Sequence, residues 1–379
     1  MPEPGGGSTS DGSSATPRRI LLATDAWRPQ VNGVVRCWES TVAELERRGV
    51  GVEVLHPGLF RTVAAPRYPE IRLALAPGRK AARRAEAFAP EAVHVATEGP
   101  VGLAVRSWCR RTSRPFTTSY HTQFPLYLRR YFGIPTSITW SFLRWFHGPA
   151  RAVLVPTEGV RRELREQGIP QARTWTRGVD QAIFHPGPWS DPALAADPFG
   201  GLSRPILLYA GRVAVEKNIE AFLALRSPGT KVVVGDGPAK ASLERRHPEV
   251  RFLGYRFGES LGRHYAAADV LVFPSRTDTF GVVMIEANAC GTPVAALPVT
   301  GPIDVIEPGL NGWLDEDLDR AVERALVVPR DRCLALARRR TWGRVADMLL
   351  EAMSTSGAGA EDAEPAGTAT AGPGVIAGR

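Results

Sequence analysis

Short β-rich runs alternate with amphipathic helical patterns along the first half of the chain. The expected strands cover residues 20–24, 51–55, 92–96, 116–120 and 152–156. The expected helices between them cover residues 34–48, 78–88, 102–111, 136–146 and 159–167. Alternation of this kind predicts a parallel sheet that is covered by helices on both faces.

The same pattern restarts at residue 206, after a Pro/Gly-rich linker at residues 185–205. The second set of expected strands covers residues 206–209, 231–234, 250–253, 270–273 and 294–296. We therefore expect an α/β protein with two doubly wound, Rossmann-like domains, 18–184 and 206–340, which face each other across a cleft. Ligands of such sheets bind outside the carboxyl ends of the strands.

Both ends of the chain differ from this pattern. Residues 341–354 carry one apolar stripe at helical spacing, formed by Trp342, Val345, Met348, Leu349 and Ala352. This stripe predicts a last helix, and such a helix needs a surface to cover. Residues 1–17 and 355–379 are rich in Gly, Ala, Ser, Pro and Thr without periodicity, so we expect disordered tails.

The stretch "SRTDTFGVVMIE", residues 275–286, places an acid on each side of a Phe-Gly pair. Thr279 is an N-cap candidate for a helix that starts near Gly281, and Phe280, Gly281 and Val282 would offer unpaired N–H groups to an anion. Glu286 would lie about 7–9 Å along the helix axis, about the span from a diphosphate to its ribose. The stretch predicts a nucleoside-diphosphate cradle, with a Glu286 paired to a structural arginine as the alternative.

Three further segments supply groups for the same chemistry. Gly211 and Arg212 end an expected strand, and Lys217 follows close behind, so two cations would stand where the cleft opens. Residues 235–237 form a Gly-Asp-Gly turn after another strand. In the first domain, Gly33 opens a helix and gives a second helix start that suits an anion.

Taken together, "TDAWRPQVNGV", "RGVD", "GRVAVEKN", "GDGP" and "DTFGVVMIEANACGTPV" resemble the family 4 retaining glycosyltransferases of the GT-B fold. The resemblance covers residues 18–353 and implies an enzyme, with GDP-mannose-dependent mannosyltransferases and glycolipid-forming glycosyltransferases as the most similar members. It implies retaining, metal-independent transfer of a hexose from a GDP-sugar or UDP-sugar to a hydroxyl acceptor, without a cofactor. No Asp-x-Asp metal motif is visible.

The resemblance implies that the last helix, residues 341–354, crosses back and packs on the N-terminal domain. It also implies roles for individual residues. Glu286 matches the ribose ligand, and Asp278 stands where the family has a Glu near the donor sugar, so sugar preference is in doubt. Arg212 and Lys217 match the cations that neutralise the diphosphate, and Gly33 matches the first loop beside it. His121 matches the active-site histidine that positions the donor sugar, with a structural histidine whose hydrogen bonds are satisfied as the alternative. Arg177 and Asp180 resemble structural residues of an interdomain loop.

Charge and targeting signals bear on partners and location. The chain has a net charge of +8, yet residues 18–182 hold 26 lysines and arginines against 13 acids. Two basic segments, 78–89 and 125–146, suit an anionic membrane surface, and in the second arginines are interleaved with aromatics. No signal peptide, run of about 18 apolar residues, metal-like cysteine spacing or nucleic-acid motif is visible. We expect a cytoplasmic protein, peripheral at the inner face of the cell membrane, with a lipid or glycan acceptor.

Alternative interpretations remain open from the sequence alone. The basic surface has the alternative role of only keeping the protein soluble. The aromatic residues of 125–146 have the alternative role of filling the hydrophobic core. A nucleotide-sugar epimerase on the same fold, or a non-catalytic nucleotide-sugar-binding protein, would carry many of the same motifs.

Overall fold

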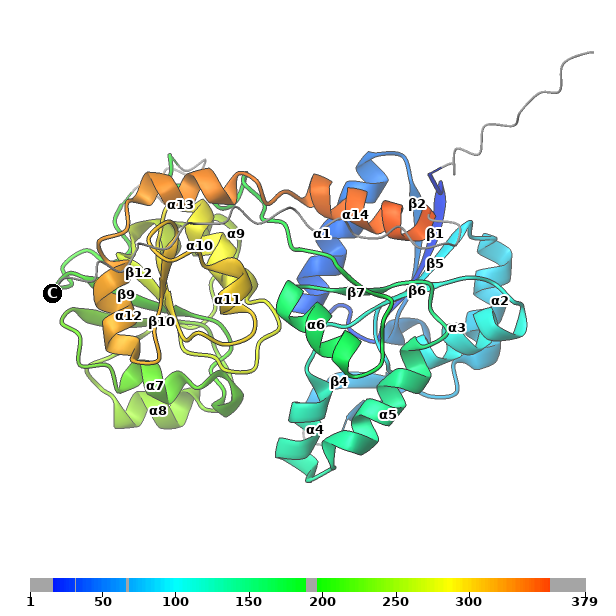
Figure 1. Cartoon of the computed structure of the whole chain (residues 1–379). Coiled ribbons are helices and arrows are strands. Elements are labelled where there is room, and N and C mark those ends of the chain that lie inside the picture. Colours follow the sequence, from blue (N-terminus) through cyan, green and yellow to red (C-terminus); the bar gives the residue numbers. More distant parts are fainter. Residues whose placement is uncertain (1–15, 31, 66–67, 189–195, 355–379) are drawn as a thin grey trace, which may run out of the picture.

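The computed structural model describes residues 16–30, 32–65, 68–188 and 196–354. Figure 1 shows these residues as two α/β lobes side by side, the N-terminal domain and the C-terminal domain. The predicted tails lie outside the described residues, apart from residues 16–17, and so does part of the predicted linker, residues 189–195.

The N-terminal domain is built on a six-stranded parallel sheet, with the strand order β2-β1-β5-β6-β7-β8. Its strands are β1 (Arg19–Ala23), β2 (Gly51–Leu55), β5 (Ala92–Val95), β6 (Thr117–Ser119), β7 (Val153–Val155) and β8 (Ala172–Thr174). Its helices are α1 (Gly33–Arg47), α2 (Gly78–Phe88), α3 (Pro100–Arg111), α4 (Phe124–Phe132), α5 (Thr136–His147) and α6 (Glu158–Glu166). An antiparallel hairpin of β3 (Thr62–Ala65) and β4 (Tyr68–Ala74) lies outside this sheet.

The C-terminal domain repeats the architecture, with a parallel sheet in the order β11-β10-β9-β12-β13-β14. The strands are β9 (Ile206–Ala210), β10 (Thr230–Val234), β11 (Arg251–Phe252), β12 (Val270–Phe273), β13 (Val294–Ala296) and β14 (Gly312–Leu314). The helices are α7 (Ile219–Leu223), α8 (Lys240–Arg246), α9 (Gly258–Ala267), α10 (Val282–Ala289), α11 (Pro302–Val305), α12 (Leu318–Ala325) and α13 (Arg330–Ala337). The predicted α/β class with two doubly wound domains is therefore confirmed.

Each sheet is buried on both faces, as expected when helices cover a parallel sheet. In β1, Leu21 and Ala23 belong to one hydrophobic cluster, whereas Ile20 and Leu22 point to the opposite face and belong to another. The alternation follows from the two-residue period of a strand. Parallel sheets place the carboxyl ends of their strands at one edge, so each domain presents one loop-rich edge for a site.

The last helix of the chain, α14 (Trp342–Ser354), packs on the N-terminal domain although it follows the C-terminal one. Figure 1 shows it lying along α1. Val345 and Leu349 are fully buried in the cluster that contains Ile20 and Trp38. The buried indole of Trp175 also donates to the carbonyl of Val345 at 2.9 Å. The apolar stripe of α14 thus completes a core that begins with the first strand.

The two domains touch through segments that follow the carboxyl ends of their strands. The Thr279 hydroxyl donates to the His121 carbonyl at 2.8 Å, and the Gly159 N–H donates to Asp304 Oδ1 at 3.1 Å. A guanidinium nitrogen of Arg36 lies 3.1 Å from Glu286 Oε1. Residues from the loop-rich edges of both sheets are therefore gathered at one place.

Candidate active site

The segment between β12 and α10 carries the Phe-Gly pair. Gly281 has a φ of +84°, in the left-handed region, and a Cβ there would lie 2.8 Å from Met284 Cε and from the Phe273 ring. Only glycine fits this position without strain. Gly281 is itself the N-cap residue of α10, which begins at Val282. The predicted capping role of Thr279 is wrong, because this left-handed residue delays the helix and the Thr279 hydroxyl donates to His121 instead.

Glu286 is 2% exposed, and each of its carboxylate oxygens has a polar neighbour. The Tyr265 hydroxyl donates to Oε2 at 3.0 Å, and Arg36 of the other domain contacts Oε1. Burial raises the pKa of the Glu286 carboxyl, while Arg36 and Tyr265 oppose that rise. The Arg36 side chain is 42% exposed, so solvent reaches the arginine that contacts the buried carboxylate. The carboxylate is paired with Arg36, which agrees with the alternative that the sequence left open.

The second acid of the motif, Asp278, is close to one of the predicted cations. Lys217 Nζ lies 2.5 Å from Asp278 Oδ1, and Asp278 Oδ2 is buried with no hydrogen-bond partner among the described residues. The Asn218 amide donates to the Pro274 carbonyl at 2.9 Å and so ties the two loops together. Lys217 ends a short 3-10 turn, Val215–Lys217. The structure thus brings Lys217 and Asp278 together at the carboxyl edge of the sheet.

Glycines allow the loops after β9 and β10 to pack against each other. A Cβ at Gly235 would lie 1.8 Å from the Gly211 carbonyl oxygen, and one at Gly237 would lie 2.4 Å from that of Val213. The Val213 N–H donates to the Asp236 carbonyl across this contact. Arg212 sits between these points, and its carbonyl accepts from the Tyr209 hydroxyl at 2.7 Å. The Gly-Asp-Gly turn therefore supports the loop that carries Arg212.

The helix start at Gly33 is partly occupied by its own cap. Asn32 Oδ1 accepts from the N–H groups of Val34 and Val35, at 3.0 Å each. The N–H of Arg36 bonds to the Asn32 carbonyl. A Cβ at Gly33 would meet nothing within 4 Å, so the space beside this residue is open. Of the predicted anion-binding groups at this helix start, the Gly33 N–H is the one that the cap does not use.

His121 follows β6 and is held by four neighbours. Trp38 Nε1 donates to its Nε2 at 2.9 Å, the Ser119 hydroxyl lies 2.9 Å from the same nitrogen, and Arg177 Nη2 lies 3.2 Å from Nδ1. The Trp175 ring packs edge-on against the imidazole. Trp38 and Arg177 can only donate, so a protonated imidazole would find no acceptor in either. Burial, followed by the Arg177 charge, lowers the pKa of His121 well below its usual range.

Arg177 has more contact with the site than the sequence indicated. Its guanidinium is buried, stacks 4.6 Å over the Trp175 ring and donates to the Trp175 carbonyl at 2.6 Å. Trp38, Ser119 and Tyr265 were not predicted as site residues either. Their contribution depends on distances between segments far apart in the chain, which no local motif records.

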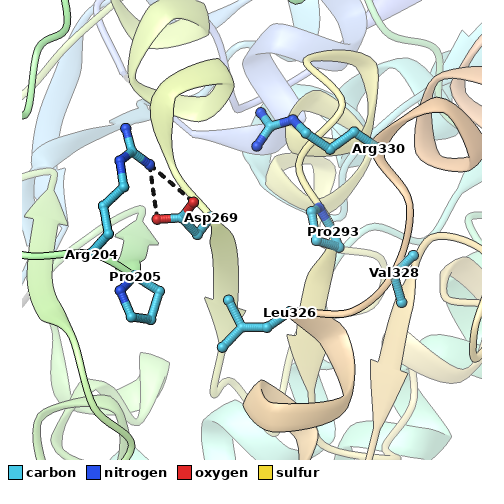
Figure 2. Close-up of a pocket in the computed structure, with 7 residues that line it drawn as sticks. All are labelled: Arg204, Pro205, Asp269, Pro293, Leu326, Val328 and Arg330. Carbon is cyan, nitrogen blue, oxygen red and sulfur yellow. Dashed lines mark hydrogen bonds and ion pairs between the residues drawn. The ribbon is translucent and has the colours of Figure 1, made fainter.

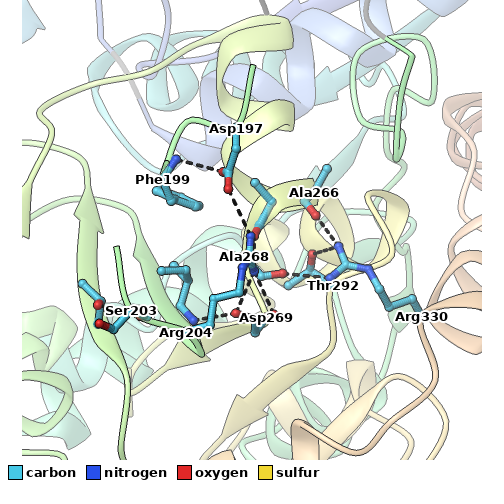
Figure 3. A network of polar contacts seen from close by, with 12 residues as sticks. Asp197, Phe199, Ser203, Arg204, Ala266, Ala268, Asp269, Thr292 and Arg330 are labelled. Atoms are coloured by element: carbon cyan, nitrogen blue, oxygen red, sulfur yellow. Dashed lines mark hydrogen bonds and ion pairs between the residues drawn. The ribbon is translucent and has the colours of Figure 1, made fainter. Parts of the chain in front are cut away.

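A hollow of about 400 Å³ lies at the opposite edge of the C-terminal sheet (Figure 2). Its lining includes Pro205, Asp269 and Pro293, which directly precede β9, β12 and β13. Figure 3 shows that Arg204 pairs with Asp269 and Asp197 there, while Arg330 donates to Thr292 and to backbone carbonyls. These arginines bind groups at the amino ends of the strands. The predicted site lies at the carboxyl ends, so this hollow is separate from it.

Among the described residues, no group of three or more His, Cys, Asp or Glu side chains is arranged to hold a metal ion. The four cysteines are free and buried.

Models of known families match both domains of the chain. Residues 31–182 match the model described as Glycosyltransferase Family 4, and residues 204–328 match the one described as Glycosyl transferases group 1. The chain is 32% identical over 364 residues to a GDP-mannose-dependent alpha-mannosyltransferase of Mycobacterium tuberculosis, covering 88% of this chain and 95% of the relative.

More distant relatives and solved structures agree with this assignment. The chain is 31% identical to the sulfoquinovosyl transferase SQD2 of Arabidopsis thaliana, over 84% of this chain and 68% of the relative. It is 27% identical to an alpha-monoglucosyldiacylglycerol synthase of Streptococcus pneumoniae, over 83% and 79%. Anabaena HepE, solved with UDP-glucose, superposes with a TM-score of 0.62 at 17% identity, over 89% of this chain and 99% of that one.

The matched domains, the full-length relatives and the shared two-domain fold lead to one assignment. The chain belongs to the family 4 glycosyltransferases of the GT-B fold, which use nucleotide sugars as donors.

Proposed function

We propose that this glycosyltransferase moves a hexose, with mannose from GDP-mannose as the first candidate, to a hydroxyl of a membrane glycolipid or lipid-linked glycan. The observation that carries the proposal is the gathering of Glu286, Lys217 and the neutral His121 where the loop-rich edges of both domains meet. The names of the mannosyltransferase and glycolipid-synthase relatives support this choice of donor and acceptor.

In this proposal the donor lies between the domains, with its ribose on Glu286 and its diphosphate near Arg212 and Lys217. The ribose hydroxyls would replace Arg36 at Glu286 Oε1. Fixed cations stabilise negative charge that grows on the leaving diphosphate, and they need no rearrangement during the reaction. These residues meet the diphosphate charge without a metal ion.

The proposed chemistry retains the configuration of the anomeric carbon. The acceptor oxygen attacks from the face that the diphosphate leaves, the glycosidic bond to phosphate breaks, and the acceptor proton passes to the departing phosphate oxygen. A neutral His121 suits a positioning role for the sugar, because an imidazole whose pKa is depressed keeps one N–H and one acceptor nitrogen for hydrogen bonds and carries no net charge. Contact between the domains excludes water, which would otherwise compete as acceptor.

Calorimetry with GDP-mannose and UDP-glucose, followed by product analysis with lipid acceptors, tests the proposal. We expect Lys217→Ala and Arg212→Ala to lower kcat more than donor affinity, because the cations act mainly on charge in the transition state. Arg245→Ala, an exposed position on α8, is the matched control. Activity should persist in excess chelator. Acceptor-independent isomerisation of the sugar would show an epimerase instead, and an inverted product would contradict retention.

We place the enzyme at the inner face of the cell membrane as a peripheral protein. No helix in the described part of the chain is long and apolar enough to cross a bilayer. A glycolipid acceptor would bring the enzyme to the membrane surface. Partition of the native enzyme between membrane and supernatant fractions, with and without high salt, measures this placement.

A further inference from the structure

Helices α4 and α5 expose a concentration of large apolar side chains. Figure 1 shows this pair projecting from the N-terminal domain, below the sheet in that view. Its exposed apolar residues form what we call the α4–α5 ridge: Leu126, Phe132, Ile138, Phe142 and Trp145. Three of them follow helical spacing along α5, and Ile138 and Trp145 are 60% and 55% exposed. Several large apolar side chains exposed on two neighbouring helices, with the Phe142 and Trp145 rings 5.8 Å apart, favour an interaction site.

The chain around the ridge carries only one sign of charge. Residues 99–157 contain no Asp, Glu or Lys and eight arginines: Arg106, Arg110, Arg111, Arg114, Arg129, Arg130, Arg144 and Arg151. The side chains of Arg130, Tyr127 and Tyr131 lie outside the described residues. A stretch of this length without a carboxylate favours an anionic partner.

A hollow of about 420 Å³ joins the cationic and the apolar parts of this surface. It is lined by Arg106, Ser107, Arg110, Arg111, Trp145 and Pro149. Arg106 stacks 4.0 Å over the Trp145 ring and donates to the Trp145 and Phe146 carbonyls, which fixes the wall of the hollow. Arg110 and Arg111 are exposed in the last turn of α3, and no carboxylate among the described residues pairs with them.

The other basic segment, α2, is less suited to such a partner. Lys80 donates to the Leu59 carbonyl and lies over the Phe60 ring, and Arg84 pairs with Glu53. Arg79 and Arg83 remain on its surface, but α2 itself exposes no large apolar side chain. Exposed arginines and exposed large apolar side chains therefore occur together on α3–α5, whereas α2 exposes basic side chains without large apolar ones.

We infer that the α3–α5 surface docks on an anionic phospholipid bilayer. The α4–α5 ridge enters the headgroup region, and the hollow beside Trp145 takes a lipid phosphate between Arg110 and Arg111. Amphipathic surfaces with apolar residues on one side and cations beside them bind anionic interfaces in this way. The inference deepens the proposed function and rests on it for the lipid acceptor. The link between the two is that α4 starts three residues after His121. A docked ridge would place the bilayer next to the proposed site.

Flotation with vesicles of phosphatidylcholine, with or without phosphatidylglycerol, tests the inference on the full chain. We expect binding to the anionic vesicles only. Arg110→Gln with Arg111→Gln should weaken it about thirtyfold, at about a factor of five for each lost charge near the surface. Ile138→Ser with Phe142→Ser should weaken it comparably. The matched control, Arg79→Gln with Arg83→Gln on α2, should lose much less.

Three outcomes would overturn the inference: equal loss in the α2 control, release of the protein by inorganic phosphate alone, or a preference for RNA over vesicles. Donor affinity by calorimetry is measured in parallel, and we expect it to be unchanged in both α3–α5 variants. An enzyme that floats with anionic vesicles yet binds no nucleotide sugar would refute the proposed function and leave the docking surface standing.

Discussion

At the residue scale, Glu286 holds a charge that the fold does not favour by itself. Because burial raises the pKa of this carboxyl, its ionised form is disfavoured in the folded protein relative to the unfolded chain above pH 4.5. Glu286→Gln removes that cost, so we expect no loss of melting temperature at pH 7. Donor affinity should fall about 10- to 150-fold, the value of one charge-assisted hydrogen bond, about 1.5–3 kcal/mol.

Calorimetric titration and thermal melting of the same samples separate the two effects. Glu323→Gln, on the exposed face of α12, provides the control. A lower melting temperature with an unchanged donor Kd would show that Glu286 is a structural partner of Arg36 and nothing more.

His94 predicts an acid-sensitive fold. It is fully buried, and desolvation lowers its pKa from 6.5 to about 3. The unfolded chain therefore binds a proton at His94 below pH 6.5, while the folded protein does not. Stability is intact above pH 6.5 and falls as the pH drops, by about 2 kcal/mol from this residue between pH 7 and pH 5.

Urea unfolding at pH 8, 7, 6 and 5 measures this loss. His94→Gln does not titrate, so its stability should decline less steeply with acid than that of the wild type. At pH 8 neither side chain titrates, so the difference in unfolding free energy between the wild type and His94→Gln gives the packing cost of the substitution. If the unfolding free energies of the two proteins fall by the same amount from pH 8 to pH 5, His94 is not the cause of the loss.

At the element scale, the long alternating pattern was enough to predict both sheets. The strand at 270–273 and its neighbours are apolar on both faces, and each is bounded by turn residues, so their type was clear from the sequence. Strands β8 and β14 were missed because β8 contains an arginine and β14 begins with a glycine, so neither shows the apolar run that marks the equally short β7 and β13. The β3–β4 hairpin was missed because its pairing, which carries an irregularity after Ala64, depends on contacts rather than on a local signal.

The last helix gives the prediction at this scale. Truncation after Arg340 removes α14 and uncovers Ile20, Trp38 and Leu45. We expect a large drop in melting temperature and in turnover, because the exposed surface belongs to the core beneath α1. Truncation after Ser354 removes only residues outside the described part and should change neither quantity.

Equal melting temperature and rate for the two truncated proteins would mean that α14 does not cover this core. Leu349→Ala keeps the helix, so its melting temperature should lie between those of the two truncated proteins. The free energy of unfolding should fall by about 2–5 kcal/mol, as for a fully buried leucine.

At the scale of the whole molecule, two of the polar contacts between the described parts of the domains come from single side chains that can be removed without leaving a charge in a neighbouring core. The Thr279 hydroxyl and the Asp304 carboxylate each bridge to the other domain. Thr279→Ala with Asp304→Ala should open the donor-free enzyme, seen as a larger radius of gyration in small-angle scattering. Each domain keeps its own core, so the melting temperature should change little.

Thr62→Ala with Asp315→Ala, whose contacts stay within one domain, is the control for this experiment. An unchanged radius of gyration would show that these two bridges do not hold the domains together.

The site divides into a part that the sequence predicts and a part that it does not. Lys217, Asp278 and Glu286 could be proposed from the sequence because each sits at a fixed offset from a strand or a glycine, and the structure places Lys217 beside Asp278. Arg36 and Trp38 were not predicted, and Arg177 was expected to be only structural, because their contacts are with other elements or with the other domain. Thr279 was misassigned because the sequence does not show that Gly281 adopts a positive φ.

The return of α14 to the first domain sets an order on how the protein is made. Ile20 and Leu22 are among the first described residues to leave the ribosome, yet Val345 and Leu349, which cover their cluster, are among the last. One face of the N-terminal sheet therefore stays incompletely covered while the whole C-terminal domain is synthesised. A nascent chain with this exposed apolar face is a ready client for chaperones, and premature termination before residue 345 leaves the cluster of Ile20 and Leu22 without the cover that α14 provides.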